Sequence, residues 1–389
     1  MRGKKKTLVS LIAASFIVLS GCQTKAEVKS LTKEEFLKKY PMVQENPNRK
    51  IILDTDLVLL NDDSYALFAL LQADSMNLLD LIGITTVGGN TLAAAAAYDA
   101  ISQLEYMNRS DIPVVQGSTE PLAGYQDMEK LQKTIGKMSY TGTYQMLENS
   151  TDDFSKVKEK GLSSSTLPEP TARPKEQSAE DFLIEQIHAH PGQVTILAIG
   201  AATNVAKALE KDPTIAQDAQ GIIYMGGIFD AAGEDLPKVE INWWYDPAAA
   251  NKALQADWKA QYVGSDDVSR TCLKGKDVYE MIKSKNTTKV TNLLMEQLSP
   301  IYEAGKEEEL LYCWDPILPA VLLNPQLAKK EQIRQMVVDE REGITYGSTF
   351  SWLQNDGPEN VPAATVLLEA DRDGFWEFLT DLYSVKIEE

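Results

Sequence analysis

Short apolar runs alternate along the chain with longer segments whose apolar residues recur at helical spacing. The first run, at residues 50–54, predicts a strand, and residues 62–73 predict the helix after it. The same pairing recurs through "LDLIGITTVGGN", "IPVVQGS", "QVTILAIG" and "GIIYMGG". Continuous apolar runs are typical of parallel strands covered on both faces. The pattern therefore predicts an α/β fold with an open, mostly parallel, doubly wound sheet.

Other parts of the chain complete this outline. Residues 119–177 break the alternation, and within them 145–177 have the Ser, Pro, Lys and Glu content of a mobile loop or a disordered segment. Residues 276–298 predict one long helix. No repeat is visible in the sequence, so we expect one domain over residues 49–389.

The N-terminus has the pattern of a secretory signal peptide rather than of a membrane-spanning helix. Basic residues precede a short apolar stretch that ends in Leu19-Ser20-Gly21-Cys22. This ending resembles the lipobox of bacterial lipoproteins, which implies a signal peptide over residues 1–21, lipidation of Cys22 and a tether with one short helix over 22–48. A lipid anchor would place the protein in the bacterial cell envelope, outside the cytoplasm and attached to a membrane. The alternative is an ordinary signal peptide followed by an incidental cysteine.

Composition narrows the classes of function. The net charge of −19 argues against a general nucleic-acid binder. The two histidines, His188 and His190, both lie near the end of one predicted helix, which argues against a catalytic or zinc-binding histidine cluster. Cys272 and Cys313 could pair, but two cysteines are not a disulfide framework, and we expect Cys313 to serve packing.

Four carboxylates stand where the first predicted strand ends. In "IILDTDLVLLNDDSYALFALL", Asp54 and Asp56 end the strand, and Asp62 and Asp63 begin the helix. Ligands of open α/β sheets bind beyond the carboxyl ends of the strands, where unpaired carboxylates are costly. Oxygen ligands without cysteine or histidine suit Ca²⁺ or Mg²⁺. The stretch therefore predicts a cation site, and the alternative is an ordinary helix N-cap.

A rival interpretation makes Asp54 a nucleophile. The same stretch is similar to the first motif of haloacid-dehalogenase-type phosphatases, and "VGSDDVS" could imitate their later acidic motif. The pair formed by Asp62 and Asp63 would then have no explanation.

The aspartate-rich stretch resembles the calcium site of the inosine-uridine-type nucleoside hydrolase family. Five later segments match that family in order: "ITTVGGN", "TILAIGAATNVAKAL", "IIYMGGIF", "VEINWWYDPAAANKAL" and "CWDPILPAVLLNP". The resemblance covers nearly the whole chain after the predicted signal peptide. It implies the open sheet of the nucleoside hydrolase type, a Ca²⁺ cofactor and hydrolysis of the N-glycosidic bond of a nucleoside.

The resemblance also implies a role for each matching residue. Asp56 would be the general base and a metal ligand, while Asp54 would support the metal site. Three further groups would complete the metal site: Asp63, Asp315 and the carbonyl of Ile199. Five residues would hold the ribose side of the substrate: Asp62, Asn90, Met225, Glu240 and Asn242.

The sequence departs from the usual family pattern at three places. Val58 and Leu60 stand where a longer family variant has glycine and a further aspartate, which could disturb the site. Trp314 replaces the histidine that many members have before the late aspartate, and it resembles the tryptophan on which a purine-preferring subgroup stacks the base. "DAAGEDLPK" lacks an asparagine that the family has between Met225 and Glu240.

Further aromatic residues could line the base side, namely Tyr125 in the loop after the third strand and either Trp243 or Trp244. We predict a lipid-anchored, calcium-dependent nucleoside hydrolase that prefers purine nucleosides, serves purine salvage and has no nucleic-acid partner. Homo-oligomers are common in the family, but no interface can be identified. Two alternatives stay open: a catalytically impaired surface protein that binds a nucleoside or another ribosyl ligand, which Val58 and Leu60 favour, and an enzyme for a different ribosyl substrate.

Overall fold

A mixed nine-stranded sheet organises the computed structural model, which describes residues 30–163, 165–233, 236–272, 274–306, 310–311 and 314–387. The strand order is β3-β2-β1-β4-β5-β6-β9-β7-β8. The strands are β1 (Lys50–Thr55), β2 (Asp80–Thr86), β3 (Val114–Gln116), β4 (Val194–Ala198), β5 (Gly221–Met225), β6 (Gln261–Gly264), β7 (Ala328–Val338), β8 (Thr349–Leu353) and β9 (Ala363–Ala370). Neighbours from β3 to β9 are parallel, and β7 is antiparallel to β9 and β8. The predicted open, mostly parallel sheet is confirmed.

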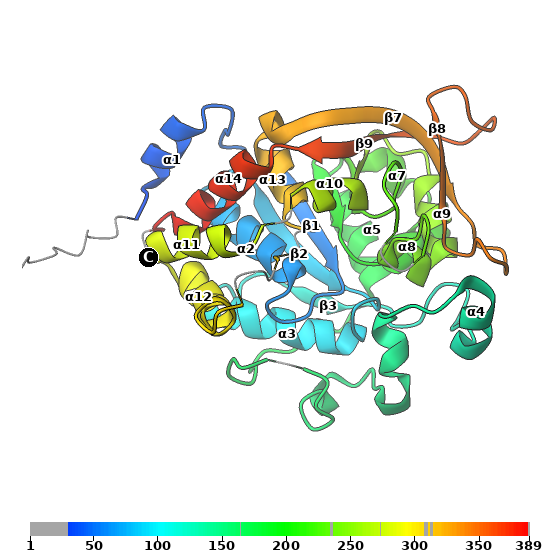
Figure 1. Cartoon of the computed structure of the whole chain (residues 1–389), viewed down its shortest axis with the longest axis horizontal. Coiled ribbons are helices and arrows are strands. Elements are labelled where there is room, and N and C mark those ends of the chain that lie inside the picture. Colours follow the sequence, from blue (N-terminus) through cyan, green and yellow to red (C-terminus); the bar gives the residue numbers. More distant parts are fainter. Residues whose placement is uncertain are drawn as a thin grey trace, which may run out of the picture.

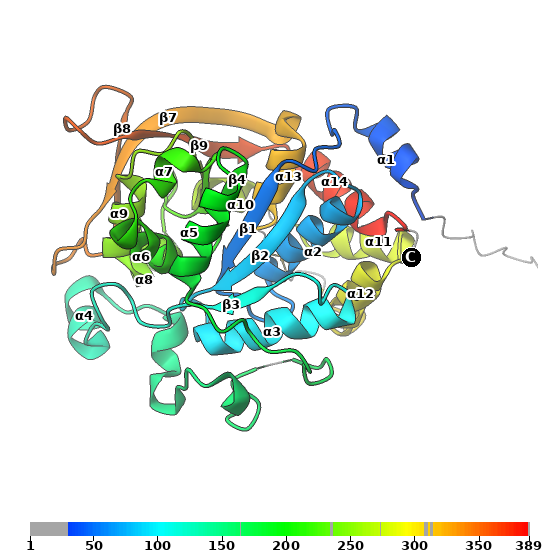
Figure 2. The ribbon, with the colours of Figure 1, turned by 180° about the vertical axis from the view of Figure 1, so that it is seen from behind.

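Helices cover both faces of the sheet (Figures 1 and 2). The α-helices are α1 (Lys33–Lys39), α2 (Asp62–Ser75), α3 (Ala93–Tyr106), α4 (Met128–Ile135), α5 (Ala179–Ala189), α6 (Thr203–Lys211), α7 (Ile215–Asp218), α8 (Ile241–Tyr245), α9 (Pro247–Leu254), α10 (Asp266–Thr271), α11 (Lys276–Ser284), α12 (Lys289–Tyr302), α13 (Ile317–Leu323) and α14 (Arg372–Ser384). Short 3₁₀ helices are η1 (Gly142–Gln145), η2 (Leu147–Asn149), η3 (Phe154–Lys156) and η4 (Pro325–Leu327).

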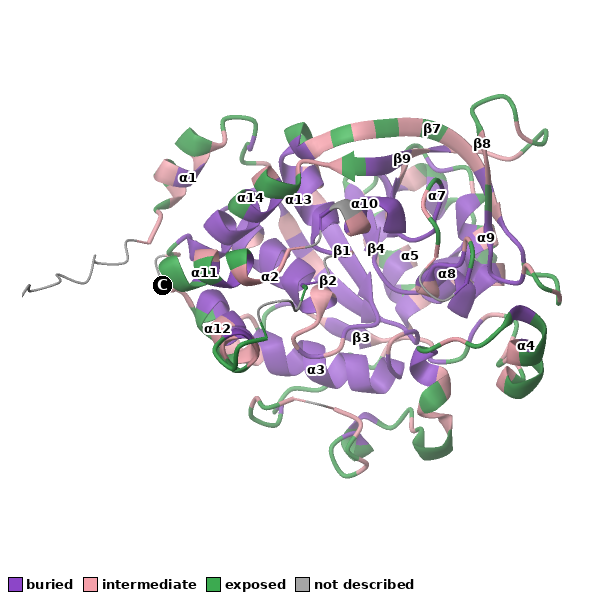
Figure 3. Cartoon of the chain, in the orientation of Figure 1, coloured by how far each residue is buried: buried purple, intermediate pink, exposed green. Residues whose placement is uncertain are grey.

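The alternation of side chains along β1 explains the two helical layers. Ile51 and Leu53 pack into one core with α2, α3 and the late helices α11 to α14, whereas Ile52 points into a second core with α5, α6 and α9. Both faces of the strand are therefore apolar, as a parallel strand requires. Helix α2 is buried between the sheet and the outer helices α13 and α14, which explains its apolar residues all round (Figure 3).

The structure departs from the predicted elements at two places near the C-terminus. The helix predicted over 276–298 is wrong: α11 ends at Ser284, and α12 begins after Thr288. The side chain of Thr288 accepts a hydrogen bond from the amide of Thr291 and caps a new helix, which explains the break. The antiparallel hairpin of β7 and β8 at the sheet edge has no counterpart among the predicted strands.

Residues 119–177 interrupt the alternation of strands and helices, as predicted, but they contain α4 and three short 3₁₀ helices and pack on the domain. Phe154 and Val157 are buried, and Arg173 lies over the Phe154 ring at 5.1 Å. The carboxylate of Glu105 on α3 accepts hydrogen bonds from the amides of Thr171 and Ala172. Contacts with α3 thus hold the outer part of this segment, and the mobility expected for residues 145–177 stays a prediction.

Residues before position 49 also pack on the folded domain. Helix α1 is the short helix expected in the tether, and its Phe36 is fully buried against Phe378 of α14. Residues 1–21, Cys22 and Cys313 lie outside the described residues, while Cys272 is buried. Among the described residues, no helix combines the length and apolarity that crossing a membrane requires.

Candidate active site at the carboxyl edge of the sheet

A cavity of about 370 Å³ lies where the parallel strands end at their carboxyl side, within the usual size range of small-molecule sites. The segments after β1, β2, β4, β5 and β6 all reach it because parallel strands end at the same edge. Most of the predicted site residues line it: Asp62, Asn90, Ile199, Met225, Glu240, Asn242, Trp314 and Asp315. The structure therefore gathers segments as far apart in the chain as Asp62 and Asp315.

Three carboxylates form the polar end of the cavity. One oxygen each from Asp62, Asp63 and Asp315 lies within 4.8 Å of the others. Asp62 and Asp63 occupy the first turn of α2, and Asp315 precedes α13. Burial raises the pKa of Asp63 and Asp315 well above the usual range, and the charges of the neighbouring aspartates raise both further. Ionising all three together requires a positive partner.

The surrounding groups fit a hard divalent cation. Asn61 donates a hydrogen bond to Asp63 over 2.8 Å, and its own buried carbonyl oxygen has no hydrogen-bond partner in the described part of the chain. The buried carbonyl oxygen of Asn242 is also unpartnered among the described residues. Unfilled oxygen acceptors in a cavity that also holds clustered carboxylates suit Ca²⁺, which prefers oxygen ligands. Asn61 is a site residue that the sequence reasoning missed.

Asp56 lies beside this cluster but outside its closest group. Its carboxylate accepts from the amide of Asn90 at 2.5 Å and from the Asn90 side chain at 3.3 Å. Gly89 permits this approach, because a Cβ there would clash with the Asp56 carboxylate. Burial raises the pKa of Asp56 to about 7, although the Asn90 amide opposes the rise. The roles predicted for Asp56, as base and metal ligand, stay predictions.

Asp54 supports the site from behind. It is fully buried and does not line the cavity, and its carboxylate accepts from Thr85 at 2.6 Å and from Asn204 at 2.7 Å. Burial raises its pKa to about 6. The dehalogenase-type alternative also leaves the clustering of Asp62 and Asp63 with Asp315 unexplained, which argues against it.

The N-terminus of α8 forms a further part of the cavity lining. Glu240 caps this helix, accepting from the amides of Asn242 at 2.7 Å, Trp243 at 3.1 Å and Gly227 at 3.0 Å. Asn242 in turn donates to the Ile199 carbonyl at 2.9 Å and to the Met225 carbonyl at 3.3 Å. The predicted metal-side carbonyl and the predicted ribose-side residues therefore belong to one hydrogen-bonded unit.

Residues 51–377 match the family model described as inosine-uridine preferring nucleoside hydrolase. This chain belongs to the inosine-uridine preferring nucleoside hydrolase family. The uridine nucleosidase 1 of Arabidopsis thaliana is 30% identical over 309 residues, covering 78% of this chain and 82% of that protein. The pyrimidine-specific ribonucleoside hydrolase RihA of Escherichia coli is 28% identical over 338 residues, covering 85% and 97%.

Solved nucleoside hydrolases share the fold. A plant nucleoside hydrolase superposes with a TM-score of 0.71 at 24% identity, over 87% of this chain and all of that one. The purine-preferring ribonucleoside hydrolase from Gardnerella vaginalis superposes with a TM-score of 0.66 at 22% identity, over 86% and 98%.

The aromatic residues of this nucleoside hydrolase are placed differently from three of the predictions. Trp314 lines the cavity as expected. Trp243 and Trp244 do not line it, because both are fully buried and pack against glycine residues. Tyr125 is also not in the lining, since its ring packs edge-on against Tyr144 at 5.9 Å.

The segment after β3 instead contributes Met138 and Tyr140 to the cavity. The Tyr140 hydroxyl donates to the carbonyl and side-chain oxygens of Asn90 at 3.2 and 3.1 Å. Sequence reasoning missed both residues because an irregular segment has no period that would indicate which side chains point inward.

The loop between Asp56 and Asp62 accommodates the two unusual residues in different ways. Leu60 adopts φ of +60°, the left-handed conformation that glycine adopts without strain, and its side chain packs on the core. Its amide donates to Ser64 at 2.9 Å. Val58 turns its side chain to the cavity. The cluster of Asp62, Asp63 and Asp315 forms even though Val58 and Leu60 depart from the family pattern.

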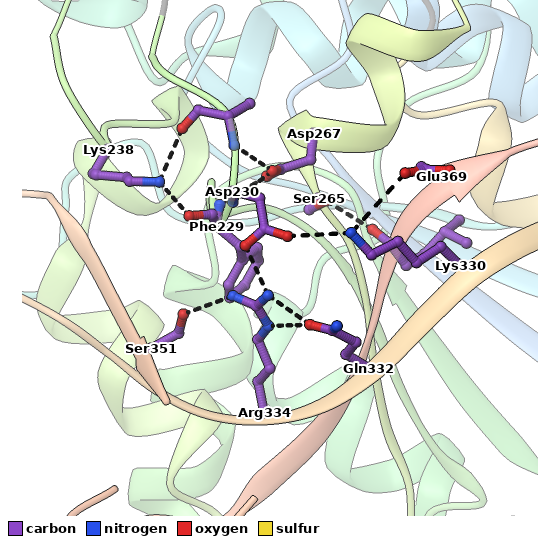
Figure 4. Close-up of polar contacts among 12 residues, drawn as sticks. Phe229, Asp230, Lys238, Ser265, Asp267, Lys330, Gln332, Arg334, Ser351 and Glu369 are labelled. Carbon is purple, nitrogen blue, oxygen red and sulfur yellow. Dashed lines mark hydrogen bonds and ion pairs between the residues drawn. The ribbon is translucent and has the colours of Figure 1, made fainter. Parts of the chain in front are cut away.

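The loop that lacks the family's asparagine is held by charged groups outside the cavity (Figure 4). Asp267 accepts from the amides of Phe229, Asp230 and Ala231 at 2.6 to 2.7 Å. Asp230 pairs with Arg334 of β7 at 2.7 Å. The same loop supplies two apolar side chains to the cavity lining, Leu236 and Val239.

Asp266 is another lining residue that the sequence reasoning did not assign. It follows β6 at the edge where Asp56 follows β1, so the strand-end rule alone could have identified it. "VGSDDVS" was considered only as a phosphatase-like motif.

Proposed function

We propose that this protein hydrolyses the N-glycosidic bond of ribonucleosides, prefers purine nucleosides, and uses Ca²⁺ as its cofactor. The main support is the convergence of Asp62, Asp63 and Asp315 at a cavity whose lining also includes Glu240 and Asn242. Such a cavity offers both a cation site and groups that can bind hydroxyls.

The reaction adds water across the bond between C1′ and the base nitrogen. The water oxygen bonds to C1′ as that bond breaks, the bonding electrons leave with the base, and the base gains a proton. Asp56 takes the proton from the water, a role that suits a carboxylate held in place by the amide of Asn90. A Ca²⁺ ion held by Asp56, Asp63, Asp315 and the Ile199 carbonyl would supply a Lewis acid and lower the pKa of that water.

The ribose is held by groups from both sides of the cavity. Asp62 accepts from one hydroxyl, and the unpartnered carbonyl oxygen of Asn242 accepts from another. Asn90 and Met225 lie on the same lining, and Glu240 completes it. Holding the sugar by its hydroxyls raises the effective concentration of the attacking water at C1′.

Preference for purines is proposed from the base side of the cavity. Trp314, Met138 and Tyr140 are there together with apolar side chains of the loop before Glu240. A flat bicyclic base has more area to stack on such a wall than a single ring has. A second candidate is preference for pyrimidine nucleosides, since the relatives of this chain include proteins named uridine nucleosidase and pyrimidine-specific hydrolase.

We also propose that the protein acts outside the cytoplasm, anchored by lipid at Cys22. The support is the N-terminal sequence, with its basic start, apolar stretch and Leu19–Cys22 ending. Globomycin, which blocks lipoprotein signal cleavage, should leave the uncleaved precursor in cells if this is correct. A Cys22→Ser variant should then no longer fractionate with the membrane.

The activity test is release of free base from inosine, guanosine, adenosine and uridine by the chain starting at Gln23, with Ca²⁺ and with chelator. Calcium-dependent release supports the proposal, and the order of the four substrates decides between the two base preferences. Calcium binding without release from any nucleoside would favour a binding protein that retains the pocket. Absence of both would contradict the proposed site.

A further inference from the structure

Asp266 has an unusual position for a carboxylate in this cavity. It is only 4% exposed and lies at the first position of α10, directly beyond β6. Its backbone amide donates to the Gly227 carbonyl at 2.9 Å, which ties the start of α10 to the turn after β5. The metal site and the ribose-binding wall described above do not use its side chain.

Both carboxylate oxygens of Asp266 are bound by side chains. Oδ1 accepts from the indole N–H of Trp314 at 2.6 Å. Oδ2 accepts from Arg270, one turn later in α10, at 2.8 and 3.1 Å. A buried carboxylate is stable when it is paired and hydrogen-bonded in this way. The arrangement keeps a charged acceptor facing the tryptophan.

The contact to Trp314 restricts the indole. Tryptophan has one N–H donor, so a short charge-assisted bond to it determines the ring position that its two side-chain torsions would otherwise leave open. Trp314 is half-buried and directly precedes Asp315. The ring face available to a base therefore depends on a residue from a different part of the chain.

The next residue, Asp267, has different hydrogen-bond partners from Asp266. Its carboxylate accepts from three backbone amides of the 229–231 loop and does not line the cavity (Figure 4). Two neighbouring aspartates thus support two different parts of the site, one a side chain and the other a loop.

We propose that Asp266 is a positioning residue for Trp314 and thereby sets the discrimination between purine and pyrimidine bases. This inference rests on the proposed function, because it concerns the same cavity. Asp266 acts through the indole and does not touch the reacting atoms.

The test is a double-mutant cycle in the chain starting at Gln23. D266A should change the ratio of kcat/KM for inosine to that for uridine by about tenfold, the effect expected when a stacking surface is lost. D266N keeps an oxygen that can accept from the indole and should change the ratio by about threefold or less. In a W314F background, which has no indole N–H, D266A should cause no further change in the ratio.

R270Q is the matched control. It removes the ion pair but leaves Asp266 in place to accept from Trp314, so the ratio should stay near that of the unmodified chain. If D266A shifts the ratio equally with and without Trp314, or if R270Q reproduces D266A, the proposal is overturned.

A spectroscopic measurement separates this proposal from the proposed activity. The near-ultraviolet circular dichroism of the unmodified chain minus that of W314F isolates the signal of Trp314. That difference should weaken in D266A and persist in D266N and R270Q, even if no nucleoside is hydrolysed. An unchanged difference in D266A, with thermal unfolding still cooperative, would overturn the positioning role while leaving the hydrolase proposal untouched.

Discussion

The two ends of the cavity are built by different means. The carboxylate end holds Asp62 and Asp63, in the first turn of the helix that follows β1, together with Asp315 before α13. The base end is the set of side chains proposed to contact the base, Trp314, Met138 and Tyr140, with Asp266 bound to Trp314. The two aspartates of α2 stand at a strand-to-helix junction that the sequence pattern indicates, whereas Met138 and Tyr140 come from a segment without such a pattern. The comparison teaches that regular junctions make one part of the cavity predictable, and that irregular connections leave the other part to the tertiary structure.

The largest expected effect is at the carboxylate end. Asp315→Asn removes one charge of the cluster, and we expect kcat for inosine to fall by at least about 10³-fold because the cation is held less tightly. Isothermal titration should show weaker Ca²⁺ binding in the same variant. Asp373→Asn, a change at an exposed acidic residue of α14, serves as the control. Unchanged Ca²⁺ affinity in Asp315→Asn would mean that the metal lies elsewhere.

Two buried carboxyls near the cavity, one behind the carboxylate end and one at the start of α8, should dominate the pH dependence of stability without metal. Burial raises the pKa of Asp54 to about 6 and of Glu240 to about 7, above the values these groups have in the unfolded chain. The folded state therefore binds more protons between about pH 4 and pH 7, so stability falls as pH rises through that range. In chelator, Tm should be lower at pH 8 than at pH 6.

Calcium should reverse this trend, because it binds the ionised carboxylates of the folded state only. The rise in Tm on adding Ca²⁺ should be greater at pH 8 than at pH 6, measured by differential scanning fluorimetry. Asp54→Asn should flatten the slope in chelator. If Tm in chelator rises with pH, burial does not raise the pKa values of these carboxyls.

A smaller and more selective effect is expected at the base end. Trp314→Ala should lower kcat/KM for inosine about tenfold and for uridine less, because a purine has the larger stacking area. Calcium affinity should stay the same, which would separate the two ends experimentally. Equal losses for both nucleosides would mean that Trp314 stabilises the fold rather than selecting the base.

The smallest effect is expected at the charged contact behind the loop before Glu240. Asp230 is half-exposed where it pairs with Arg334, and exposed ion pairs contribute about 1 kcal/mol or less. Asp230→Asn should therefore change KM for inosine by about twofold at most. A much larger rise in KM would show that this ion pair determines the position of Leu236 and Val239 in the cavity wall.

Much of the carboxylate end could be predicted from local sequence. A strand-end aspartate and a helix-start aspartate must lie at the same edge, so Asp62 and Asp63 were placed correctly beside the cavity. The orientation of Asp56 was not predictable, since it depends on the amide of Asn90 from the next strand. Tyr140 was missed, and Tyr125, named as one residue that could line the base side, does not line the cavity. A long irregular segment has no pattern that indicates its inward side chains.

The amino-acid sequence by itself determined the parallel sheet, the edge that bears the site and the oxygen-rich character of the metal cluster. These properties follow from apolar periodicity and from residues only a few positions apart. The tertiary structure decided that Asp315 meets Asp62 and Asp63, that Asp266 holds Trp314, and that β7 and β8 complete the sheet as an antiparallel edge. Such contacts join residues far apart in the chain, and only the packing of helices and loops on the sheet brings them together.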